Sequence, residues 1–115
     1  MPALELLDRL FEPVTLRSFV DDYWPGRVLH AHGDLRRVEA LRELPELNDV
    51  GPLFAAARDV ILFYRDDGGK QVQAVLPAHY ASRVYAAGMT ALVTALHQSV
   101  PLLGELVREL EQQTG

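Results

Sequence analysis

The sequence predicts an α+β fold, in which short helices surround a small antiparallel sheet. Two β-rich runs, 59–64 and 70–76, flank an Asp-Asp-Gly-Gly turn and indicate a hairpin. Apolar residues recur at helical spacing near both ends of the chain. Prolines and glycines interrupt the sequence between these segments, so we expect every element to be short.

The N-terminal part of the chain is expected to be helical. Residues 3–11 place three leucines and a phenylalanine on one face, and Pro13 ends that helix. Thr15 is suited to cap a second short helix, 16–23, because its hydroxyl can accept a hydrogen bond from a free backbone N–H. Trp24, followed by Pro-Gly, then turns the chain.

The next stretch alternates between short elements. Residues 27–32 are β-prone, so we expect a brief strand there that joins an edge of the sheet. Asp34 is positioned to cap a helical turn that runs to residue 41. A loop over 45–52 and a short helix over 53–58 are expected to lead into the hairpin.

The C-terminal third is predicted to run helix, strand, helix. A short helix follows Pro77 and ends at Gly88, and residues 89–96 are expected to form a third strand of the sheet. The final helix begins near Pro101 and is amphipathic. Its apolar stripe consists of Leu102, Leu103, Leu106, Val107 and Leu110.

Composition limits the kinds of protein that this chain can be. Its 115 residues are expected to form a single small domain, residues 1–115, with one core. The absence of cysteine excludes disulfides and thiolate sites and favours a cytoplasmic location. A net charge of −5 without a basic stripe argues against nucleic acid. No apolar run approaches the roughly 20 residues that span a bilayer, so we expect no membrane insertion.

Three motifs resemble a known family. The segments are FVDDYWPGRVLHAHG at 19–33, YAAGMTALV at 85–93 and VPLLGEL at 100–106, with the hairpin 59–76 between them. Their order and spacing are similar to the region before the metal-binding barrel in bacterial cupin-like proteins of the JmjC superfamily. The resemblance covers most of residues 16–110.

This resemblance carries expectations about fold and function. Complete members are double-stranded β-helix oxygenases that use Fe(II) and 2-oxoglutarate to hydroxylate a protein or peptide side chain. Their iron ligands, a His-x-Asp/Glu pair and a distant His, lie in the barrel, and no position here matches them. Only five residues follow Leu110. The resemblance therefore implies an N-terminal portion lacking the barrel, with no catalytic residue and no cofactor of its own.

His30 and His32 are the one candidate metal site. On a strand, residues two apart face the same side, so both imidazoles could reach one ion, with Asp34 as a possible carboxylate ligand. The alternative is that both histidines lie exposed at a strand end while Asp34 caps the following turn.

Two further features are candidate interaction sites. Trp24 is either a packing anchor or part of a docking patch for a protein partner. The apolar stripe of the last helix is buried either in the chain's own core or against another chain, which would make a dimer.

Three functional hypotheses remain open at this point. The first is a non-catalytic accessory or N-terminal unit of an oxygenase-type protein, serving packing, assembly or substrate docking. The second is a stand-alone binding or dimerisation module. The third is a metal-dependent enzyme that uses His30 and His32.

Overall fold

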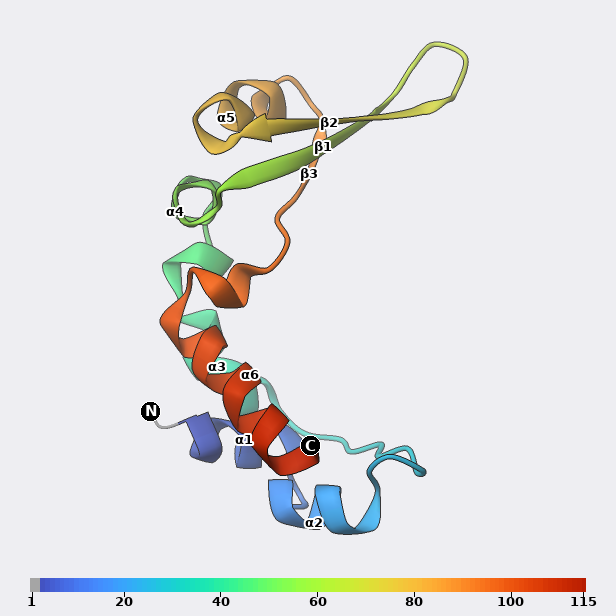
Figure 1. The fold of residues 1–115 in the computed structure, drawn as a ribbon. Helices are drawn as coiled ribbons and strands as arrows, with labels where there is room; N and C mark the ends of the chain where they lie inside the picture. Colours follow the sequence, from blue (N-terminus) through green and yellow to red (C-terminus); the bar gives the residue numbers. More distant parts are fainter. Residues whose placement is uncertain (1–2) are drawn as a thin grey trace. The chain divides into compact units, whose positions relative to one another are not determined.

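The computed structural model describes residues 3–115 and has the predicted α+β class (Figure 1). Three strands form an antiparallel sheet, and helices make up most of the remaining regular structure. The strands are β1 (Asp59–Arg65), β2 (Gln71–Pro77) and β3 (Thr90–Leu92). The α-helices are α1 (Ala3–Phe11), α2 (Leu16–Asp22), α3 (Glu39–Arg42), α4 (Val50–Ala56), α5 (Ala78–Ala86) and α6 (Pro101–Thr114), and three 3₁₀ turns are η1 (Leu35–Val38), η2 (Pro45–Leu47) and η3 (Leu96–Gln98).

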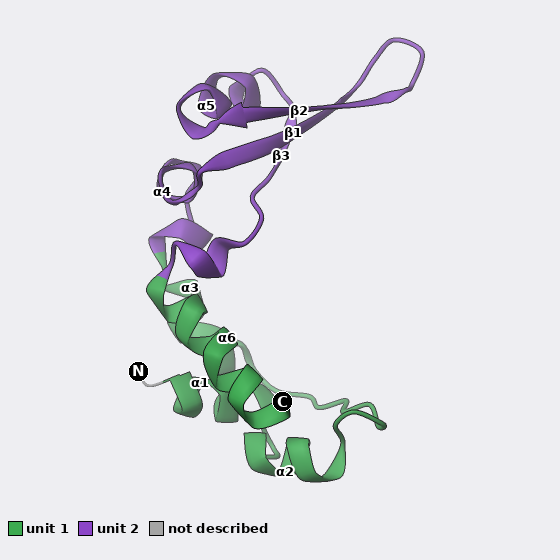
Figure 2. Cartoon of the chain, viewed as in Figure 1, with its two compact units in different colours: residues 1–44, 101–115 green, residues 45–100 purple. Residues whose placement is uncertain are grey.

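The chain divides into two compact units (Figure 2). Unit 1 contains residues 3–44 and 101–115, and unit 2 contains residues 45–100. Each unit has its own cluster of buried apolar side chains among the described residues. We expected one core, whereas the described residues form two such clusters, one on the terminal helices and one on the sheet with α4 and α5.

Unit 1 is built around the apolar faces of α1, α2 and α6. Leu6 and Leu7 of α1, Leu16 of α2 and Leu106 of α6 are buried together. Thr15 caps α2 as predicted, since its side chain accepts a hydrogen bond from the backbone N–H of Ser18 at 3.1 Å. Partly buried apolar residues surround this core: Ala3, Leu10, Phe11, Val20, Ala40, Leu41, Leu102, Leu103 and Leu110.

Unit 2 contains the sheet, whose strand order is β2-β1-β3. The predicted hairpin is confirmed, with Val60 opposite Leu76 and Leu62 opposite Ala74. Val60 and Leu62 of β1 are buried with Phe54 of α4 and Ala81 of α5, so both helices cover the same face of the sheet. The turn forms as the sequence indicated, because the Asp66 carboxylate accepts hydrogen bonds from the backbone N–H groups of residues 68 and 70.

The predicted strand over 27–32 is wrong. These residues have no regular secondary structure, and Arg27, Val28 and His30 are exposed. A β-prone run becomes a strand only when another strand supplies its hydrogen bonds, and the described part of unit 1 contains none.

Two other boundaries differ from the prediction. The third strand is shorter than residues 89–96, because β3 pairs with β1 only over three residues and Ala95 takes a left-handed backbone with φ 53°. The helix expected over 53–58 starts earlier, at Val50, where Asp49 caps it by accepting from the N–H of residue 51. Pro52 is tolerated because the first N–H groups of a helix have no intrahelical partner.

Candidate functional site

The segment 24–34, which joins α2 to η1, borders two pockets of unit 1. It leaves α2 where the backbone N–H groups of Tyr23 and Trp24 both bond to the carbonyl of Phe19. It ends at Asp34, whose carboxylate accepts from the Arg36 N–H at 2.8 Å and so caps η1. Between these points, the side chains of Arg27 and Arg37 hydrogen-bond to the backbone carbonyls of Asp22 and His32. Residues of this segment line both pockets.

The first pocket, which we name the aromatic groove, has a volume of about 550 Å³. Phe11 and Phe19 stack with ring centroids 4.3 Å apart, and Trp24 lies tilted against Phe19 at 6.4 Å. Trp24 is 50% exposed and Val28 is 90% exposed. The lining comprises residues 10–11, Phe19, residues 24–25 and 27–31, and Arg37.

The charged side chains of the aromatic groove are all basic. The Arg27 guanidinium lies 4.8 Å from the centre of the Tyr23 ring and donates to the Asp22 carbonyl at 3.3 Å. Arg37 donates to the His32 carbonyl at 3.1 Å. No carboxylate belongs to the described residues that line the groove. The groove thus combines an apolar floor with positive charge.

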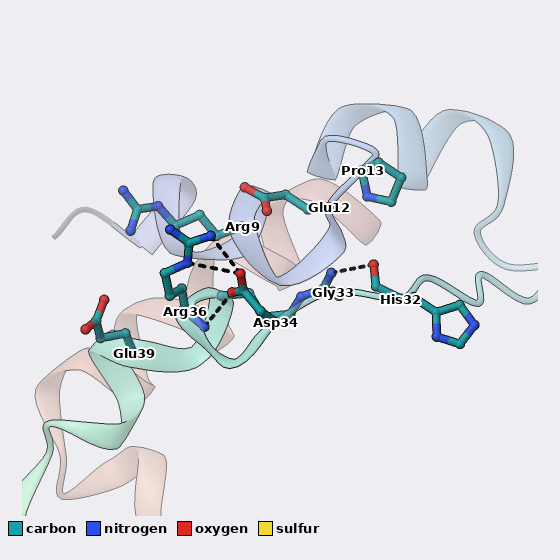
Figure 3. Close-up of a pocket in the computed structure, with 9 residues that line it drawn as sticks. Arg9, Glu12, Pro13, His32, Gly33, Asp34, Arg36 and Glu39 are labelled. Carbon is teal, nitrogen blue, oxygen red and sulfur yellow. Dashed lines mark hydrogen bonds and ion pairs between the residues drawn. The ribbon is translucent and has the colours of Figure 1, made fainter.

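The second pocket is polar and has a volume of about 600 Å³ (Figure 3). Arg36 and Asp34 form an ion pair at 2.8 Å. The hydrogen bond from the Arg36 side chain lowers the pKa of Asp34, and the same contact raises the pKa of Arg36. Arg9 is paired with Glu5 at 3.3 Å, and Glu12 and Glu39 also line the pocket. The positive and negative side chains that line this pocket are therefore equal in number.

Arg37 links the two pockets because it lines both. Its guanidinium occupies the space that a Cβ at position 33 would take, so a glycine is needed there for this packing. The Arg37 Nε is buried without a hydrogen-bond partner among the described residues. A side chain larger than hydrogen at position 33 would therefore displace this arginine.

The two histidines of the predicted metal site lie close to each other. Their ring centroids are 4.8 Å apart in an edge-on arrangement, and both side chains are exposed. The strand expected to align them is not formed, and the His32 ring points away from Asp34 (Figure 3). Asp34 instead acts as the helix cap of the alternative interpretation. Within residues 3–115, no three His, Cys, Asp or Glu side chains gather as a metal site requires.

The apolar stripe of α6 lies in unit 1's own core. Leu106 is buried, and Leu102, Leu103 and Leu110 pack against it. Val107 is half-buried and lies outside that cluster. Sequence reasoning missed the part that Phe11, Phe19 and Arg37 take in the aromatic groove. The one available signal was that Phe19, Tyr23 and Trp24 lie close together in the sequence.

Comparisons with protein-family models, curated proteins and solved structures gave no match to this chain. The resemblance to JmjC-type cupin-like proteins therefore stays a prediction from the motifs. Among the described residues, none of the helices has the length and apolar character needed to cross a bilayer.

Proposed function

We propose that this chain is a non-catalytic binding unit, of the kind that precedes the barrel in cupin-like proteins of the JmjC superfamily, and that its aromatic groove docks a protein segment. The observation that carries the proposal is the position of Trp24. This indole forms a wall of a 550 Å³ groove yet remains half exposed. Large aromatic side chains at an open cleft are typical anchors of protein interfaces.

The packing around Trp24 supports a binding role over a purely structural one. Phe11 and Phe19 stack beside it, so three aromatic rings line the groove. The core of unit 1 is complete without Trp24, since Leu6, Leu7, Leu16 and Leu106 are buried among themselves. A partner that covers the indole would remove apolar surface from water, which is favourable.

The family part of the proposal rests on the motifs in the sequence and on their spacing. The quoted motifs fall on the hairpin, on the end of α5 with β3, and on the start of α6. In this proposal, unit 1 supplies the docking groove and the chain contributes no iron ligand. Fe(II) and 2-oxoglutarate belong to the barrel of the complete family members.

A second candidate, self-association through unit 2, is favoured by the open face of the sheet. By register, Ile61 lies between Val75 and Leu92 on the face opposite α4 and α5. Val75 is 58% exposed and Leu92 45% exposed. A row of apolar side chains across three strands is a surface that a second copy could cover.

One pair of measurements tests the proposed function. The purified chain is incubated with Fe(II) and 2-oxoglutarate, and succinate is measured against a blank without protein. We expect no succinate above the blank. Succinate formation that disappears in His30→Ala and His32→Ala would overturn the non-catalytic assignment. Light scattering over a range of concentrations then separates the two binding candidates: a monomer supports docking of another protein, and a concentration-dependent dimer supports self-association.

A further inference from the structure

The aromatic groove carries a charge opposite to that of the whole chain. The chain has sixteen acids and eleven bases, for a net charge of −5. The charged groups that line the groove are Arg27 and Arg37, with His30 beside them, and none of its described lining residues is acidic. An apolar cleft whose charged residues are all positive favours partners that carry negative charge.

Arg27 is held in place before any partner arrives. Its guanidinium stacks over the Tyr23 ring and donates one hydrogen bond to the Asp22 carbonyl. A guanidinium has five N–H donors, so most remain for a ligand. A planar, preorganised fork of this kind is suited to a carboxylate, which it binds through two parallel hydrogen bonds.

The aromatic rings that line the groove favour an apolar side chain of the partner. Phe11, Phe19 and Trp24 supply three aromatic rings, and the volume of about 550 Å³ lies within the roughly 300–1,000 Å³ of clefts that hold small ligands or peptide side chains. The ring faces accept leucine, methionine or aromatic side chains.

From these observations we infer that the groove binds an acidic segment of a partner protein. A phenylalanine or leucine of that segment packs against the aromatic rings of the groove, and neighbouring Asp or Glu side chains pair with Arg27 and Arg37. This inference rests on the proposed docking function and adds the chemical class of the partner. The polar pocket is less suited to such a segment, because Arg9 and Arg36 are already paired with Glu5 and Asp34, and Glu12 and Glu39 add negative charge to its lining.

A displayed library of random linear peptides tests the inference without a known partner. The full chain is the bait, and Arg27→Glu serves for counter-selection. We expect enriched peptides to combine an aromatic residue or leucine with at least two acidic residues. Enrichment of basic or uncharged peptides, or no enrichment, would overturn the inference.

Synthetic versions of the enriched peptides then measure the charge effect. Fluorescence anisotropy of a labelled peptide should show binding weakened about threefold by Arg27→Gln and about tenfold by Arg27→Glu. Arg65→Glu is the matched control: it makes the same change in net charge on β1 of unit 2, outside the groove. Equal weakening by Arg27→Glu and Arg65→Glu would contradict a local contact. Unchanged circular dichroism shows that each variant folds.

The outcomes separate this inference from the proposed function. A selection that yields no acidic peptide, in a chain that also makes no succinate and stays monomeric, overturns only the inferred partner class. Succinate formation that disappears in the two histidine variants overturns the proposed function itself. A dimer in which Trp24 becomes buried identifies the occupant of the groove as a second copy, which contradicts the inferred acidic partner.

Discussion

Replacing Leu62 by alanine should be among the most damaging single changes in unit 2. Leu62 is 0% exposed and lies on the central strand β1, in one cluster with Phe54, Val60 and Ala81. Leu→Ala substitutions in cores cost about 2–5 kcal/mol, and the cost rises with the size of the cavity that remains.

The surroundings of Leu62 place the expected cost in the upper half of that range. Its cross-strand neighbours are Ala74 on β2 and Ala91 on β3. Neither alanine has the length to move into the vacated space, so the cavity should persist. We therefore expect a loss of about 3–5 kcal/mol in the free energy of unfolding, a large share of the roughly 5–15 kcal/mol of a typical domain.

The assay is urea unfolding followed by far-ultraviolet circular dichroism. Val75→Ala is the control, because it removes apolar atoms from the same sheet at a 58% exposed position on the open face. We expect it to change the free energy of unfolding by less than about 0.5 kcal/mol. A Leu62→Ala effect below about 1 kcal/mol, or a Val75→Ala effect of equal size, would refute the assignment of the buried face.

Two further predictions concern backbone and charge. Gly88 has φ 104°, so Gly88→Ala should cost about 1–3 kcal/mol in thermal or urea unfolding. Gly26→Ala, at an open position, should cost far less, and equal costs would contradict this reasoning. The pKa of Asp34 is lowered by Arg36, so the stability contributed by its charge is present above the ordinary carboxyl pKa and is lost as pH falls through the lowered value. The difference in urea midpoint between wild type and Asp34→Asn should be small and constant near neutral pH and should shrink in acid. A difference that widens in acid would show that the ion pair with Arg36 does not stabilise the fold.

Elements with local signals were predictable from sequence. The hairpin follows from the Asp66 turn and the alternation after it, and α2 begins where Thr15 caps it. Gly88 ends the α5 segment as its freedom to take positive φ suggested. In each case the deciding interaction spans only a few residues, so the sequence contains it.

Features that depend on distant partners were not predictable. Residues 27–32 have β-prone side chains, yet no strand lies beside them in the described part of unit 1. The sequence also gave no indication that Phe11 and Phe19 would stack, or that Arg37 would lie over residue 33. The aromatic groove arises from these tertiary contacts. Of its residues, only Trp24 was named in advance as an interaction candidate.

Trp24, against which we propose that a partner docks, is the chain's only tryptophan. Quenching of its fluorescence by acrylamide therefore reports on the aromatic groove directly. We expect substantial quenching in the free chain, because the indole is half exposed, and clear protection when a selected acidic peptide is bound. Saturating peptide binding that leaves the quenching of Trp24 unchanged would rule out docking in the aromatic groove, because the partner would then lie elsewhere on the chain.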